Sequence, residues 1–171
     1  MTVGVSLFKR ALGQFASGVT VVTTVNAQGR PLGLTVTAFC SVSLDPPLVL
    51  VSIDNRSDAH DGLGSSGLFG VSLLAEGQED VSRRFARGGA SKFEGLSLLT
   101  GRHGVLLVPG ALAQIECRVA ATLPGGDHTL YLGEVLTVSV SPGRPLVYQA
   151  GHYRHLKELD HAGTTTSAGT V

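Results

Sequence analysis

Apolar positions along most of the chain alternate with polar ones or form short unbroken runs, as they do in β-strands. Every residue from 19 to 25 is Val or Thr, and the polar run 26–29 that follows ends in glycine, which is typical of a turn between two strands. Further runs of this kind predict strands over residues 32–43, 48–53, 68–74, 112–123, 129–140 and 145–148. The pattern therefore predicts about seven strands.

Two segments have helical spacing instead. Residues 6–16 carry apolar side chains at i, i+4 and i+7 after Ser6, a candidate N-cap, and residues 78–87 have a shorter apolar face followed by two glycines. Ser57 is placed to cap a third, short helical turn. Strands in this number, with two or three short helices, indicate a mainly β protein with a closed or nearly closed barrel rather than a doubly wound α/β sheet.

Composition narrows the class of protein. Of 171 residues 43% are hydrophobic and only 15% are charged, which fits one well-buried domain. We expect this domain over residues 1–157 and a disordered tail over the small polar residues 158–171. Basic and acidic residues balance at 13 each without a basic stripe, so nucleic acid is not an expected partner. Apolar runs are far shorter than the ~20 residues of a membrane span, and the start has no secretory signal, so we expect a cytoplasmic protein.

Cysteines and histidines offer no metal-binding pattern. Cys40 and Cys117 are far apart, without a C-x-x-C motif or a histidine at ligand spacing, and we expect both to be buried as small apolar residues. His152 and His155 are three residues apart, but no third ligand stands at a suitable spacing. The sequence therefore predicts no metal site.

One glycine-rich stretch imitates a nucleotide-binding motif. Residues 62–67 match G-x-G-x-x-G, which binds a pyrophosphate only when a strand precedes it and a helix begins within it. Here a polar segment precedes the motif and a strand-like segment follows it, so we favour a glycine-rich loop. A serine hydrolase is not supported either, because no G-x-S-x-G elbow occurs.

Hydroxyl side chains recur at every second position in part of residues 35–43. Period-two alternation places Thr35, Thr37, Ser41 and Ser43 on one face of the predicted strand. This ladder fits either an ordinary half-exposed strand or a polar groove for a long ligand with hydroxyl and heteroaromatic groups.

Three other clusters each permit a ligand-binding interpretation and a plain structural one. The loop 54–60 combines a cation, a hydroxyl and a helix start, which suits either a phosphate or a solvated turn. Residues 83–85 place two arginines beside an aromatic ring, which suits an anion, a ring system or simply a charged helix end. Residues 126–128, Gly-Asp-His, begin a strand, where the histidine approaches a ligand or belongs to a plain hairpin turn.

Taken together, the order and spacing of four strings resemble the short-chain flavin reductases, the reductase components of two-component flavin-dependent monooxygenases. The similarity spans about residues 6–156. The strings are Thr35-x-Thr37-Ala38-x-x-Ser41-Val42-Ser43-x-Asp45-Pro46-Pro47-Leu48-Val49, Gly126-Asp127-His128, Gly133-x-Val135 and Pro145-Leu146-x-Tyr148-x-x-Gly151-x-Tyr153. This resemblance implies a flavin reductase-like split β-barrel of Greek-key type.

The resemblance also implies an activity. It indicates a homodimeric enzyme that transfers hydride from NADH to FAD, or alternatively FMN, and supplies reduced flavin to a separate monooxygenase or halogenase. Two alternatives stay open at this point. One is an FMN enzyme similar to pyridoxamine-phosphate oxidase, and the other is a flavin carrier or sensor without catalysis.

Site residues follow from the same resemblance, position by position. Flavin-ring and ribityl contacts are expected from Thr35, Thr37, Ala38 and Ser43, with Val36, Ser41 and Ser52 beside them. Phosphate contacts are expected from Asp54, Ser57 and His60, and helical support for the flavin from Arg84 and Phe85. The nicotinamide is expected to lie beside Tyr153 and beside His128, the candidate catalytic residue. Asp58 departs from this scheme, because a carboxylate next to a phosphate is unfavourable.

Overall fold

The computed structural model describes residues 3–157, and the predicted tail lies outside them. The helices are α1 (Val5–Leu12), α2 (Asp58–Ser66) and α3 (Glu79–Phe85), with a 3₁₀ helix η1 (Ala90–Phe93). The strands are β1 (Ser17–Gly18), β2 (Thr20–Val25), β3 (Pro31–Val36), β4 (Phe39–Leu44), β5 (Pro47–Asp54), β6 (Leu68–Leu73), β7 (Leu99–Thr100), β8 (Leu106–Leu107), β9 (Ala113–Gly125), β10 (His128–Val140), β11 (Val147–Gln149) and β12 (His152–Arg154). The short strands β1, β7, β8 and β12 were not predicted.

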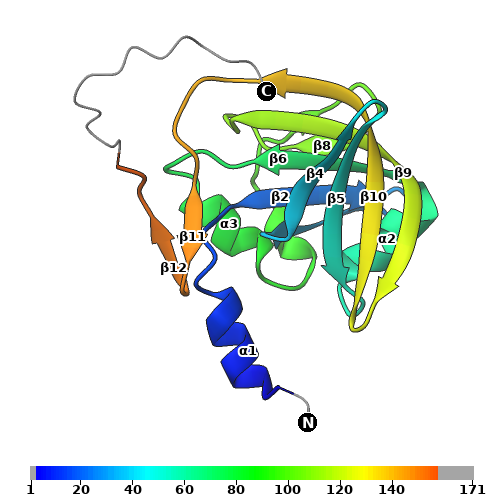
Figure 1. The fold of residues 1–171 in the computed structure, drawn as a ribbon. Helices are drawn as coiled ribbons and strands as arrows, with labels where there is room; N and C mark the ends of the chain where they lie inside the picture. The colour runs from blue at the N-terminus through cyan, green and yellow to red at the C-terminus, as the bar shows by residue number, and fades with distance from the viewer. Residues whose placement is uncertain (1–2, 158–171) are drawn as a thin grey trace.

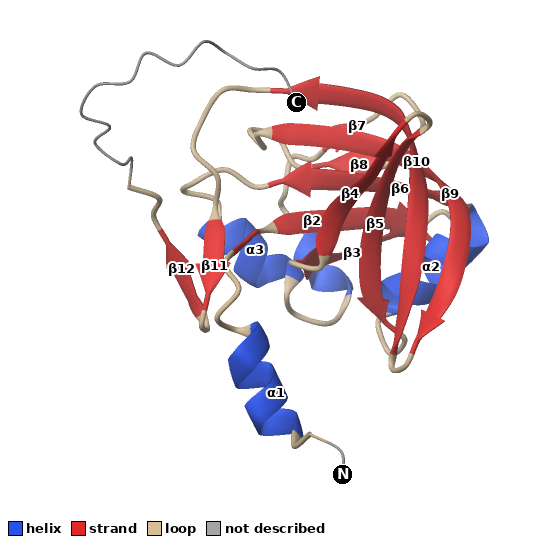
Figure 2. Ribbon diagram, in the orientation of Figure 1, coloured by secondary structure: helices blue, strands red, loops and turns tan. Residues whose placement is uncertain are grey.

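Seven strands form one antiparallel sheet in the order β3-β2-β6-β9-β10-β5-β4, and this sheet curls into a barrel (Figure 1). Its two edge strands, β3 and β4, follow each other along the chain but do not pair, so the barrel is split between them. The predicted mainly β split barrel is confirmed. A smaller sheet of β1, β11 and β12 lies beside it (Figure 2).

The barrel interior is filled by apolar side chains from all seven strands and from α2. Among the largest fully buried ones are Phe69 and Ile53, and burial of a side chain of this size stabilises the fold by about 1.5–3 kcal/mol. A second core lies outside the barrel wall, between β2, α3 and the segment that leads into β11. Its buried members are Val19, Val21, Leu74, Phe85, Val108 and Leu146. The two cores hold α3 and α2 against the same strands, β2 and β3.

The predicted strand 32–43 is wrong as a single element, because the chain changes its pairing partner within it. β3 pairs with β2 as far as Val36, and β4 pairs with β5 from Phe39 onward. Thr37 and Ala38 lie between these strands, at the split. The chain bends there because its two halves belong to opposite edges of the sheet.

The predicted ladder of hydroxyls on one face is therefore also wrong. Residues opposite each other in paired strands share a face. Thr35 faces the second core, outside the barrel, whereas Ser41 is opposite Val49 of the barrel core. An irregularity in the pairing after Ser41 then places Ser43 opposite Leu48, on the other face from Val49.

The glycine-rich stretch 62–67 belongs to a helix, not to the predicted loop. Ser57 caps the start of α2, as predicted, because its side chain accepts a hydrogen bond from the amide of Ala59. Gly67 ends the helix in the left-handed conformation at φ 67°. A helix that ends at this motif offers it no free N-terminal amides, which agrees with the rejection of a dinucleotide turn.

The prediction that both cysteines are buried is right for one of them and wrong for the other. Cys117 is fully buried in the barrel core, as predicted, and burial raises the pKa of its thiol to about 12. Cys40 is exposed, because it lies on the outer face of the edge strand β4. Both cysteines are free.

Helix α1 projects from the barrel instead of packing against it (Figure 1). It begins at Val5 after Gly4, not after the predicted cap Ser6, and none of its residues is buried. Its apolar side chains are more than half exposed, as is Phe15 beyond its end. No helix within residues 3–157 is both long enough and apolar enough to cross a membrane.

Candidate functional site

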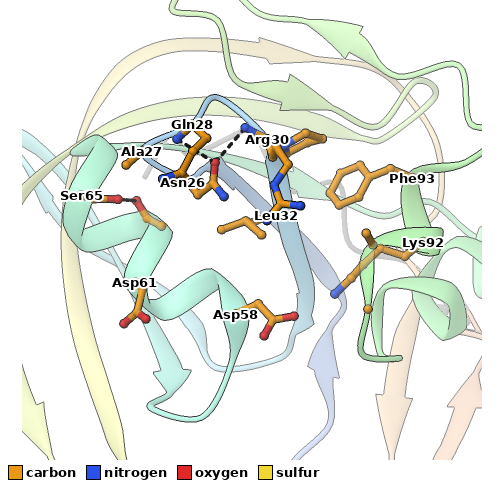
Figure 3. A pocket seen from close by; sticks show the side chains of 14 residues that line it. Asn26, Ala27, Gln28, Arg30, Leu32, Asp58, Asp61, Ser65, Lys92 and Phe93 are labelled. Carbon is orange, nitrogen blue, oxygen red and sulfur yellow. Dashed lines mark hydrogen bonds between the residues drawn. The ribbon is translucent and has the colours of Figure 1, made fainter.

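Three adjoining hollows meet where the end of β3, the start of α2 and the end of α3 come together. The central hollow, of about 260 Å³, is lined by Leu34, Thr35, Arg56, Ser57, Asp58, Phe85, Ala86, Arg87, Gly88 and Lys92. The basic hollow, of about 450 Å³, is lined by Asp80, Arg83, Arg84, Arg87, Gly88, Ser91 and Lys92. The turn hollow, of about 710 Å³, lies between α2 and the β2–β3 turn (Figure 3). Lys92 lines all three.

Within the central hollow, Thr35 and Ser57 come together as the resemblance implied. Ser57 caps α2, so the first amides of the helix and the positive end of its dipole lie at this hollow. The Oγ1 atom of Thr35 donates to the carbonyl of Ser82 on α3 at 2.6 Å, and its lone pairs stay available as acceptors. The hollow thus combines a helix N-terminus with a fixed hydroxyl, which suits a phosphate and the polar chain attached to it.

Lys92 lines all three hollows, and the sequence argument did not single it out as a candidate site residue. Its Nζ atom donates to the carbonyl of Gly33 on β3 at 2.7 Å, which leaves two of its three protons for a ligand. Burial lowers the pKa of Lys92, while the nearby Asp58 carboxylate opposes this shift. A lysine in a glycine-rich segment after α3 was the only signal in the sequence, and it does not reveal where the side chain lies.

Arg84, a predicted flavin contact, holds the segment that carries Lys92. Its guanidinium donates to the carbonyls of Lys92 at 2.9 Å, of Ser91 at 3.3 Å and of Glu94. The planar guanidinium group thereby fixes three carbonyl groups of one turn. Arg84 is thus a positioning residue, because its donors are directed at the backbone.

Phe85, the second residue predicted from this helix, is a core residue at the wall of the central hollow. Only 1% of its surface is exposed, and its ring is edge-on to that of Phe93 at 5.2 Å between centroids. Such a pair stabilises both rings beyond their burial. Phe85 thus forms part of the wall of the central hollow while it packs in the second core.

Asp54 and Arg56 form a pair at the end of β5. The Asp54 carboxylate accepts from the Arg56 backbone amide at 2.9 Å and from two guanidinium nitrogens at 3.1 and 2.8 Å. These hydrogen bonds hold the pKa of Asp54 well below its ordinary value. Asp54 therefore orders the loop into α2, and its negative charge is balanced before any anion binds.

His60 does not lie at the phosphate end of the hollow. One face of α2 lines the turn hollow with Asp58, Asp61 and two further residues, which recur about once per turn. His60 is on the opposite side of the helix. Its Nε2 atom is 3.0 Å from Oγ1 of Thr129, and its ring is edge-on to Tyr131. Within one chain, the helical phase of α2 therefore directs the His60 ring toward β10, and the structure does not bring His60 together with Thr35 and Ser57.

The two residues expected beside the nicotinamide are far apart within one chain. His128 starts β10, with its Nδ1 atom 2.7 Å from Oδ1 of Asp127, and its Cα is paired across the strands with Asp54. Tyr153 is on β12, where its hydroxyl donates to Oγ of Ser82 at 2.9 Å. Figure 1 shows β12 and the β9–β10 turn on opposite sides of the molecule. A single chain does not bring them together.

The remaining predicted residues lie around the split. The side chain of Val36 is 5% exposed and packs in the barrel core, so only its backbone is free to meet a ligand. Thr37 and Ala38 are exposed between the edge strands, and the Ala38 carbonyl accepts from the amide of Ser52 at 3.1 Å. Ser41 is exposed and Ser43 half-buried on β4. The backbone around Thr37 and Ser52 thus lies beside the split, continuous with Thr35.

Comparison with known proteins adds three findings. A model of the flavin reductase like domain matches residues 12–157. The NADH-dependent flavin reductase of a Rhodococcus species is 45% identical over 153 residues, which cover 88% of this chain and 86% of that protein. The reductase component of 4-hydroxyphenylacetate 3-monooxygenase from Thermus thermophilus is 47% identical over 150 residues, covering 87% and 95%.

A solved structure of a flavin oxidoreductase is also similar to this chain. The NADH:FAD oxidoreductase of Streptomyces globisporus, in complex with NAD and FAD fragments, superimposes with a TM-score of 0.84 at 36% identity. The match covers 92% of this chain and 94% of that one.

Proposed function

The chain belongs to the flavin reductase like domain family, and on that premise we propose that it is an NADH-dependent flavin reductase. It transfers hydride from NADH to FAD or FMN and supplies the reduced flavin to a separate monooxygenase or halogenase. The observation that carries the proposal is the central hollow. There a capped helix start, the Lys92 ammonium and the Thr35 hydroxyl converge within a chain whose relatives carry this activity in their names.

The residues present fit a flavin phosphate and its ribityl chain. Ser57 and the first amides of α2 favour an anion, Lys92 supplies a cation, and Thr35 supplies a hydrogen-bond acceptor. When bound, the flavin supplies the acceptor for hydride at its N5 atom. The backbone from Thr35 to Ala38 would hold the ring at the split, where Thr37 is exposed.

The part played by the protein is mainly positioning. Holding two rings in contact makes hydride transfer effectively unimolecular, which lowers the entropic part of the barrier. Amides and hydroxyls near Thr35 and Thr37 would stabilise the negative charge that develops on the reduced ring system. His128 would orient the nicotinamide through a hydrogen bond, with its own Nδ1 fixed by Asp127.

A homodimer is part of the proposal. Several apolar side chains that a single chain leaves exposed support it, namely Val5, Leu7, Phe8, Leu12, Phe15, Val138 and Val140. An exposed apolar helix such as α1 is stabilised when a second copy covers it. In such a dimer, His128 of one chain and Tyr153 of the other would border one nicotinamide.

We also place the enzyme in the cytoplasm. Two free cysteines, Cys40 and Cys117, suit a reducing compartment. NADH as co-substrate and a partner oxygenase or halogenase fit the same location.

The test is NADH oxidation followed by absorbance with and without added FAD or FMN. The proposal expects rapid oxidation that requires added flavin, and reduced flavin that a flavin-dependent monooxygenase can use. Flavin binding without NADH oxidation would indicate a carrier or sensor. Oxidation of pyridoxamine phosphate without NADH turnover would indicate the FMN oxidase instead.

A further inference from the structure

The turn hollow continues the proposed flavin site. It shares Asp58 and Lys92 with the central hollow, so a ligand whose phosphate lies beside Ser57 has a direct path into it. The central hollow, at about 260 Å³, is smaller than most ligand pockets, which measure roughly 300–1,000 Å³, whereas the turn hollow is about 710 Å³. FMN ends at its phosphate, but FAD continues through a second phosphate to adenosine.

An aromatic ring and apolar side chains line this hollow. Figure 3 shows Phe93 and Lys92 on one side of the hollow, with Leu32 and Asp58 across from them. Phe93 is only half-buried, and its ring is held edge-on by Phe85. Aromatic rings of this kind bind nucleobases by stacking, regardless of hydrogen-bonding pattern.

Charged groups in the hollow match the rest of an adenosine diphosphate. The Arg30 guanidinium has no hydrogen-bond or ion-pair partner within residues 3–157. The turn that carries it is rigid, because Oδ1 of Asn26 accepts from the amides of Gln28 at 3.0 Å and Arg30 at 2.9 Å. Arg30 and Lys92 provide two cations for two phosphates. Asp58, unfavourable beside a phosphate, can accept a hydrogen bond from a ribose hydroxyl, as acidic residues do in dinucleotide sites.

The basic hollow fits adenosine less well. Arg83 is already paired with Asp80 at 2.8 Å and stacks on Tyr153, and Arg84 binds backbone carbonyls. Its lining contains no aromatic or aliphatic side chain against which a base could stack.

We infer that the turn hollow binds the adenosine half of FAD, so that Arg30 and Phe93 make this enzyme prefer FAD to FMN. This inference rests on the proposed function. It assigns a specificity role to two residues outside the predicted flavin site.

The test compares Arg30→Gln and Phe93→Leu with the unaltered protein in fluorescence titrations of FAD and FMN. Both variants are expected to weaken FAD binding about tenfold and FMN binding less than twofold. ADP should compete with FAD in the unaltered protein and lose that effect in Arg30→Gln. Arg102→Gln, which removes an exposed arginine from the β7–β8 turn, is the matched control and should change neither affinity.

Equal losses for FAD and FMN, or no loss for either, would overturn the inference. If Phe93→Leu does not fold, Arg30→Gln and the ADP competition still decide it. A failure of the proposed function has a different signature, because the unaltered protein would then oxidise NADH with neither flavin.

Discussion

Arg84 and Lys92 are joined by a hydrogen bond of 2.9 Å from the guanidinium Nε of one to the carbonyl oxygen of the other. The side chain of Lys92 then reaches back to the Gly33 carbonyl on β3. Helix α3 thus sets the position of a cation that lies at the junction of three hollows. Arg84, which the resemblance marks as a flavin-binding residue, thus directs its donors to the backbone of the segment that carries Lys92.

Arg84→Lys is expected to weaken FMN binding about tenfold, because a lysine cannot bind three carbonyls in one plane and the segment 91–94 loosens. Riboflavin, which has no phosphate, should bind the variant as well as it binds the unaltered protein. Fluorescence titration with both ligands checks this. An unchanged FMN affinity would show that Lys92 is held in place without Arg84.

Lys92→Gln is expected to reduce FMN affinity and to remove part of its pH dependence. Because burial lowers the pKa of Lys92, its positive charge is lost as pH rises at a pH below the ordinary lysine value of 10.5. FMN binding to the unaltered protein should therefore weaken as pH rises toward that value, while riboflavin binding does not. The same pH curve in Lys92→Gln as in the unaltered protein would exclude a phosphate role.

His128→Ala is expected to raise the KM for NADH and to lower turnover, with flavin affinity nearly unchanged. Loss of one orienting hydrogen bond corresponds to about 1–3 kcal/mol, or roughly 5-fold to 150-fold in kcat/KM. Steady-state kinetics at varied NADH and a separate flavin titration measure the two effects. A normal NADH response together with weak flavin binding would move His128 to the flavin side of the site.

Glu116→Gln tests a buried carboxylate remote from the proposed site. Glu116 is 3% exposed and accepts from the amides of Arg102 and His103 and from the hydroxyl of Thr137. Losing charge-assisted bonds of this kind should cost about 1–3 kcal/mol in the free energy of unfolding, measured with urea.

The same carboxylate predicts a pH dependence of stability. Burial alone would raise the pKa of Glu116, but its hydrogen bonds outweigh that effect and lower the pKa below 4.5. The folded pKa is therefore below the unfolded one, so this contribution is full above pH 4.5 and is lost as pH falls through the folded value. Glu116→Gln should therefore lose less stability than the unaltered protein as pH falls below 4.5. An equal loss of unfolding free energy with falling pH in both proteins would show that other groups cause the acid dependence.

Several features of the fold could be predicted because neighbouring residues determine them. The run of β-branched residues before Asn26 and the glycine of the following turn produce the β2–β3 hairpin, since both act within a few residues. The cap at Ser57 and the start of β10 at His128 depend on equally local chemistry. The predicted ladder of hydroxyls was wrong because side chains alternate between two faces only while a strand keeps one pairing partner. The chain changes its pairing partner at Thr37.

By itself, the sequence determined the mainly β class, the family and the residues Thr35 and Ser57 of the central hollow, because strand period, turn chemistry and motif spacing are properties of adjacent residues. Only the tertiary structure decided that Lys92 lies at that hollow and that His60 points away from it. Both outcomes depend on how α2 and α3 are rotated against β2 and β3. That rotation is set by packing of the two cores between segments far apart in the chain, which no local pattern encodes.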